Sequence, residues 1–281
     1  MKRNGTLREN GHTIKAVTFD LWETLLFEKD GASAERTSAR CRKLAHALNR
    51  FEALVSIEQV KDALNKTISS LLKEWNKNKD VTHMDQIQLF LENLPKRSAM
   101  PKTKLKDLSS AYVSPFFEVP PYLNPDAHTT LKWLKERHNR IGLICNTGLT
   151  PGTALRRFLS EQKVSDHFDL MVFSDEVGIR KPDCRIFQLV AKKMKMEPRE
   201  VVHIGDNLKA DVYGAKSAGF KAIHFSSDAG RDKIAEADPK SLVLISRNLG
   251  SVEKEQMKPD KTITSLATVG KAIEEIEAGT S

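Results

Sequence analysis

Residues 16–25 read Ala-Val-Thr-Phe-Asp-Leu-Trp-Glu-Thr-Leu, a short apolar run that stops at an aspartate. The first four residues have the length and composition of a buried β-strand. Ligands of open parallel sheets bind beyond the carboxyl ends of the strands. The stretch therefore predicts a strand at 16–19 and places a candidate functional carboxylate, Asp20, directly after it.

The pattern changes from residue 31 to residue 117. Apolar residues recur there at intervals of three and four, as in Val60, Leu64 and Ile68, which is typical of a buried helix face. Prolines at 95, 101 and 115 punctuate the segment. The segment therefore predicts an all-helical insertion of about four helices behind the first strand.

After residue 118 the pattern alternates between strands and helices. Buried-type runs predict strands at 141–145, 170–173, 201–204, 222–225 and 242–245, with one more beginning at Ile263. Single helices separate most of them, which favours βαβ units and a parallel sheet. The predicted fold class is α/β: a Rossmann-like parallel-sheet core at 14–30 and 118–281, with an inserted all-helical domain at 31–117. The polar residues 1–13 are expected to form a flexible tail.

Composition excludes several classes of protein. Hydrophobic residues make up 40% of the 281 and charged residues 29%, which is ordinary for a globular chain. No apolar run reaches the roughly 18 residues that cross a bilayer, so we expect no membrane partner. Residues 1–15 contain no apolar segment of the kind found in secretory signals. Three scattered cysteines do not suggest disulfides, which favours a cytoplasmic location.

The formal net charge is +8, which attracts anions. Basic residues gather at Arg36, Arg40, Arg42 and Lys43, and again between 96 and 106, but no aromatic residues alternate with them as a single-strand binder requires. These groups are interpreted as solvated helix faces. The expected partner is a small phosphorylated substrate and not a nucleic acid. The sequence predicts no oligomeric state.

Polar residues follow several of the predicted strands. Asn146 and Thr147 follow the second strand, Lys181 lies after the third, and Asp206 follows the fourth. Two carboxylates at adjacent strand ends repel each other unless a cation lies between them, and Mg²⁺ prefers carboxylate and phosphate oxygens. A carboxylate can also attack phosphorus, which divides one difficult step into two.

Four segments, in this order, resemble the motifs of the haloacid dehalogenase-like hydrolase superfamily. They are Phe19–Leu25, Ile144–Gly148, Gly178–Asp183 and Gly205–Asp206 with Asp211. The position of the helical insertion also matches. The resemblance implies a Mg²⁺-dependent phosphatase of small phosphomonoesters, in which residues 31–117 form a cap that closes over the site.

The resemblance also implies roles for individual residues. Asp20 would be the nucleophile, forming an aspartyl-phosphate, and Lys181 the second catalytic residue. The metal would be held by Asp20, Asp206 and the backbone carbonyl of Trp22. The residues implied in binding substrate are Thr24, Cys145, Asn146 and Thr147. Asn207 and Asp211 would support the site from outside the metal's direct contacts.

Three residues depart from the pattern of the family's phosphatases. Trp22 replaces an aspartate that acts as general acid, Glu23 replaces a glycine, and Cys145 replaces a serine or threonine. General acid–base help is worth about 10²–10⁴-fold, and Glu23 is a candidate substitute for the missing acid. A thiol is a weak donor, and Cys145 can also be a small packed residue.

These departures leave two alternatives to the phosphatase. One is a binding or regulatory protein on a catalytically degraded scaffold. The other is a metal-independent dehalogenase of 2-halo acids, which needs no general acid because a halide leaves without a proton. Asp206 argues against the dehalogenase.

Overall fold

A computed structural model describes residues 14–50, 54–95, 102–226 and 257–279. Its main sheet runs in the order β5-β4-β1-β6-β7-β8, and every neighbouring pair is parallel. The strands are β1 Ala16–Phe19, β4 Arg140–Cys145, β5 Leu170–Phe173, β6 Val201–Gly205, β7 Lys221–Phe225 and β8 Lys261–Ile263. The predicted parallel α/β core is confirmed. The predicted tail at 1–13 and strand at 242–245 lie outside the described residues.

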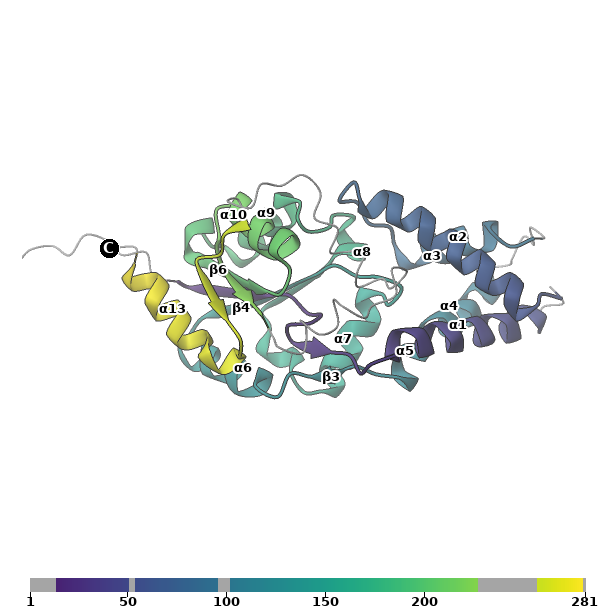
Figure 1. The fold of residues 1–281 in the computed structure, drawn as a ribbon, viewed down its shortest axis with the longest axis horizontal. Helices are drawn as coiled ribbons and strands as arrows, with labels where there is room; N and C mark the ends of the chain where they lie inside the picture. Colours follow the sequence, from purple (N-terminus) through teal and green to yellow (C-terminus); the bar gives the residue numbers. More distant parts are fainter. Residues whose placement is uncertain (1–13, 51–53, 96–101, 227–256, 280–281) are drawn as a thin grey trace, which may run out of the picture.

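Helices cover both faces of this sheet (Figure 1). Side chains alternate along β1, so Val17 and Phe19 join a cluster with α6 Ala127–Glu136, α7 Gly152–Glu161 and α13 Val269–Ala278. Ala16 faces the opposite cluster, which contains α9 Cys184–Met194 and α10 Gly214–Ser217. Strands covered on both faces read as continuous apolar runs, which is why the sequence revealed them.

The insertion after β1 is helical, as predicted. It contains α1 Ala32–Asn49, α2 Ile57–Trp75, α3 His83–Glu92, α4 Lys102–Val113 and α5 Pro115–Glu118. Capping boxes at Ser56 and Thr82 fix the starts of α2 and α3. Leu44, Leu64 and Phe90 belong to a hydrophobic cluster separate from the two in the core. In Figure 1, α1–α4 lie together to the right of the sheet.

Short elements complete the architecture. An antiparallel pair, β2 Leu26–Phe27 and β3 Tyr122–Leu123, joins the chain where it enters and leaves the insertion. The other short helices are η1 Ser165–His167, α8 Ser174–Val177, η2 Pro198–Glu200, the π-helix η3 Leu208–Tyr213 and η5 Leu266–Thr268. Within the described ranges, no helix combines the length and apolar character that crossing a membrane requires.

Candidate active site

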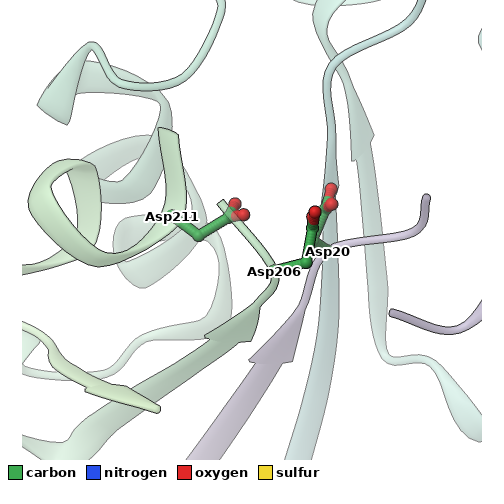
Figure 2. A group of neighbouring side chains, drawn as sticks. All are labelled: Asp20, Asp206 and Asp211. Atoms are coloured by element: carbon green, nitrogen blue, oxygen red, sulfur yellow. The ribbon is translucent and has the colours of Figure 1, made fainter. Parts of the chain in front are cut away.

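Three aspartates meet at the carboxyl edge of the sheet (Figure 2). Asp20 follows β1, Asp206 follows the neighbouring strand β6, and Asp211 lies in η3. One carboxylate oxygen from each lies within 4.8 Å of the others. Gly205 permits the approach of η3, because a Cβ there would lie 2.3 Å from Cγ of Asp211. The parallel topology therefore brings together residues that are up to 191 positions apart.

Lys181 connects two of these carboxylates. Its Nζ donates to Oδ1 of Asp20 and to Oδ1 of Asp211, both at 2.6 Å. Burial alone lowers the pKa of Lys181, but the two carboxylates outweigh burial and raise it above the usual lysine value. Burial raises the pKa of Asp20 to about 6 despite the opposing effect of Lys181. At neutral pH the lysine is therefore charged and Asp20 is mostly ionised.

Asn146 holds the backbone on which Lys181 lies. Its Nδ2 donates to the Lys181 carbonyl at 2.9 Å, and its Oδ1 accepts from the Lys181 N–H at 2.8 Å. Asn146 also lines the pocket beside Asp20. Its amide group is thus engaged in positioning the lysine, a contact that the sequence did not predict.

Asp211 is held by a buried network. Its Oδ2 accepts from the Asn207 N–H at 2.9 Å, and its Oδ1 accepts from Nε2 of His203 at 3.1 Å. The Thr18 hydroxyl lies 2.9 Å from Nδ1 of His203. Burial raises the pKa of Asp211, but Lys181 and His203 outweigh it and hold that pKa below the usual range. Asn207 also caps η3 through the N–H groups of residues 209 and 210.

A pocket of about 140 Å³ lies between this edge and the helical insertion. The core contributes Asp20, Glu23, Lys181, Asp206 and other residues, and the insertion contributes Arg36, Arg40 and Trp75. The interpretation of Arg36 and Arg40 as solvated is wrong, because they are only 7% and 3% exposed. Both lie on the buried face of α1, which continues at intervals of four residues through Leu44 and Leu48. This spacing of four is the sequence pattern that indicates their burial.

Of the four residues implied in binding substrate, two line the pocket and two do not. The side chains of Thr24 and Cys145 are fully buried, and neither lines the pocket. Burial raises the pKa of Cys145 well above its usual value, so it remains a thiol, which fits the packing alternative. Thr147 lines the pocket, and its hydroxyl lies 3.2 Å from that of Ser174. Substrate contact by Thr24 and Cys145 stays a prediction that their burial does not support.

Trp22 and Glu23 both line the pocket. The Trp22 ring meets Phe116 edge-on at 6.3 Å, and the guanidinium of Arg36 lies 6.0 Å from its centroid. The ring therefore lies between the core and the insertion. Glu23 has a φ of 56°, in the left-handed region that favours glycine. Ligation by the Trp22 carbonyl stays a prediction.

Asp80, between α2 and α3, is a site residue that the sequence did not reveal. Its Oδ2 accepts from the Ser174 hydroxyl at 2.5 Å, from Nη1 of Arg180 at 2.5 Å and from the Thr147 hydroxyl at 3.3 Å. The Asp80 N–H also donates to the Gly178 carbonyl. Asp80 thus ties the insertion to the loop that carries Lys181. A single acid in a polar loop gave no sequence signal.

Comparisons with known proteins agree with this fold. A family model described as haloacid dehalogenase-like hydrolase matches residues 14–219. A glyceraldehyde 3-phosphate phosphatase from Methanopyrus kandleri is 27% identical over 81% of this chain and 89% of its own. A phosphoserine phosphatase from Thermus thermophilus is 31% identical over 48% of this chain and 52% of its own. A 2-haloacid dehalogenase structure from Pseudomonas syringae has a TM-score of 0.63 at 18% identity, covering 94% of this chain and 99% of that one.

Proposed function

The chain belongs to the haloacid dehalogenase-like hydrolases, and on this premise we propose that it is a Mg²⁺-dependent phosphatase of small phosphomonoesters. The observation that carries the proposal is the bridge from Lys181 to Asp20 and Asp211, next to the carboxylate of Asp206. Several similar proteins are named as phosphatases of small phosphorylated metabolites, which supports the substrate class.

The donor set fits a hard divalent cation. All three clustered groups are carboxylates, the ligand type that Mg²⁺ prefers. The Asp211 oxygens already accept from Lys181, His203 and Asn207, so Asp20 and Asp206 are the carboxylates that would hold the ion. The Trp22 carbonyl would complete the protein ligands, and Asn207 and Asp211 would support them. When bound, the ion would neutralise charge on the phosphoryl oxygens.

Asp20 would attack phosphorus as the ionised carboxylate. The bond from phosphorus to the ester oxygen breaks as the bond to Asp20 forms, and the leaving oxygen takes a proton. Water then attacks the aspartyl-phosphate, releasing inorganic phosphate and restoring Asp20. Lys181 balances negative charge beside the reacting carboxylate. We assign the proton transfers to Glu23, which lines the pocket one residue after Trp22.

Residues 31–117 would act as the cap, over a core made of 14–30 and 118–281. A pocket of about 140 Å³ suits a small metabolite. Asn146 and Thr147 line this pocket and are the predicted substrate-binding residues that a phosphoryl group could reach. A cytoplasmic location stays a prediction.

The test is hydrolysis of p-nitrophenyl phosphate with and without Mg²⁺. We expect metal-dependent turnover in the wild type and a loss of about 10³-fold or more in Asp20→Asn, because the nucleophile is removed. Asp62→Asn, an exposed change of the same kind in α2, should leave the rate unaltered. Full activity in Asp20→Asn would refute the mechanism. An inert wild type rescued by Trp22→Asp would favour the binding-protein alternative.

Trp22 is the observation that favours the dehalogenase alternative, because it removes the usual general acid. The acidic cluster argues against that reaction, since carboxylates beside Asp20 repel the carboxylate of a halo acid. Chloride release from 2-chloropropionate measures it directly. We expect none above background, and turnover that is independent of Mg²⁺ would replace the phosphatase proposal.

A further inference from the structure

Arg40 is a buried cation without a carboxylate partner. It projects from α1, lines the pocket, and is 3% exposed. Its Nε donates to the Tyr112 carbonyl at 2.7 Å, and its guanidinium lies 5.1 Å from the Tyr112 ring. Among the described residues, no carboxylate lies within ion-pair distance of Arg40, and no further hydrogen bond from its terminal nitrogens is found.

The two other buried arginines of the pocket differ from Arg40 in this respect. Arg36 forms an ion pair with Glu28, and Arg180 forms one with Asp80. Arginine stays protonated in proteins, and a buried charge is costly unless an opposite charge meets it. The fold thus compensates two of these guanidinium groups. It leaves the third without an anion, on a residue that lines the cavity, where a ligand can supply one.

We infer that Arg40 binds a second anionic group of the substrate, a carboxylate or a phosphate, while the phosphoryl group lies at Asp20. The inference rests on the proposed phosphatase and narrows its substrate class. Arg40 belongs to the insertion, whereas Asp20 and Lys181 lie at the sheet edge, so the two sites bound the pocket from different sides. A guanidinium fork matches either anion in a bidentate manner. The volume of about 140 Å³ suits a substrate of a few carbon atoms.

The test compares three phosphomonoesters that share a three-carbon frame. They are 3-phosphoglycerate, propane-1,3-diol bisphosphate and glycerol 3-phosphate, whose far ends carry a carboxylate, a phosphate and neutral hydroxyls. The readout is the ratio of kcat/KM for each compound with a second anionic group to that for glycerol 3-phosphate. Both values come from one preparation, so the ratio is independent of the fraction of folded protein. The larger of the two ratios identifies the anion.

We expect the wild type to prefer one of the two compounds with a second anionic group by about tenfold or more, because a charged hydrogen bond is gained. Arg40→Gln should lower that ratio by about 10–100-fold, and Arg40→Lys should retain part of it. Arg42→Gln removes the same charge from an exposed position of α1 and should keep the wild-type ratio. This control variant separates binding at Arg40 from attraction of the anionic substrate by the overall positive charge of the protein.

Two outcomes of the kinetic comparison overturn the inference. One is a wild-type ratio near one for both compounds. The other is an unchanged ratio in Arg40→Gln, which would place Arg40 on the transferring phosphoryl group or in packing alone. If the wild type hydrolyses none of the three, calorimetry with 3-phosphoglycerate and the bisphosphate decides the inference. The proposed function itself fails only if p-nitrophenyl phosphate is not hydrolysed either. Binding that Arg40→Gln abolishes supports the anion site, and binding that persists, or is absent from the wild type, overturns it.

Discussion

Glu23 has a left-handed backbone conformation and also lines the pocket. Its backbone lies in the left-handed region with φ of 56°, which costs about 1–2 kcal/mol for a residue with a side chain. The residue also lines the pocket that contains Asp20. Strain of this kind gathers at functional sites, where surrounding structure holds it in place. The glycine that is usual in this family would remove both the strain and the carboxylate.

Glu23→Gln should lower kcat for glycerol 3-phosphate by about 10²-fold or more, because its alkoxide leaving group needs a proton. The loss for p-nitrophenyl phosphate should be smaller, since nitrophenolate leaves without one. Steady-state kinetics on both substrates measure the difference. Glu35→Gln, an exposed change in α1, is the matched control. Equal rates for Glu23→Gln and wild type on the alkyl ester would remove Glu23 from the mechanism.

The junction between α2 and α3 acts on the site through the neighbouring loop. The backbones of Lys79 and Ile179 form an isolated antiparallel β-bridge, and the Arg180 N–H donates to the Asn78 carbonyl at 3.0 Å. These contacts adjoin Lys181 directly. The guanidinium of Arg180 also lies 4.4 Å from the centroid of the Trp75 ring. The insertion therefore fixes the loop that carries Lys181.

Asp80→Asn should lower the free energy of unfolding by about 3 kcal/mol, because it leaves the Arg180 guanidinium buried without a carboxylate. Urea unfolding measures this, and kcat should fall as well because the Lys181 loop loses its anchor. The double variant Asp80→Asn with Arg180→Gln should lose less than the sum of the single changes. A single variant as stable as wild type would show that the ion pair contributes nothing.

Several elements were predictable because local pattern and topology agree. The apolar strands preceding Asp20 and Asp206 are short and buried on both faces, and parallel pairing then brings their ends together. Arg40 and Asp80 were not predictable in this way. Periodicity shows which face of a helix is buried but not what lies opposite that face. A loop acid has no period at all. Thr24 and Cys145 show the converse limit, since a motif position does not reveal whether its side chain faces the pocket or is buried away from it.

At the scale of the whole molecule, unfolding exposes groups that the fold keeps uncharged. His83 is half-buried between Ser109, at 2.9 Å from its Nε2, and the Tyr112 ring. Burial first, and Arg40 second, lower its pKa from 6.5 to about 4. Below pH 6.5 the unfolded chain therefore binds a proton that the folded protein does not. Stability from this group is present above pH 6.5 and is lost as the pH falls towards 4.

The free energy of unfolding should therefore decrease from pH 7.5 to pH 4.5, with His83 contributing about 1–2 kcal/mol after allowance for its partial exposure. Urea unfolding at pH 7.5, 5.5 and 4.5 measures the slope. His83→Asn removes the titrating group and should give a flatter dependence than wild type. His46→Asn, an exposed change in α1, should keep the wild-type slope. If His83→Asn and wild type lose stability in parallel, the acid sensitivity arises elsewhere, and the buried carboxylates around Lys181 are the next groups to examine.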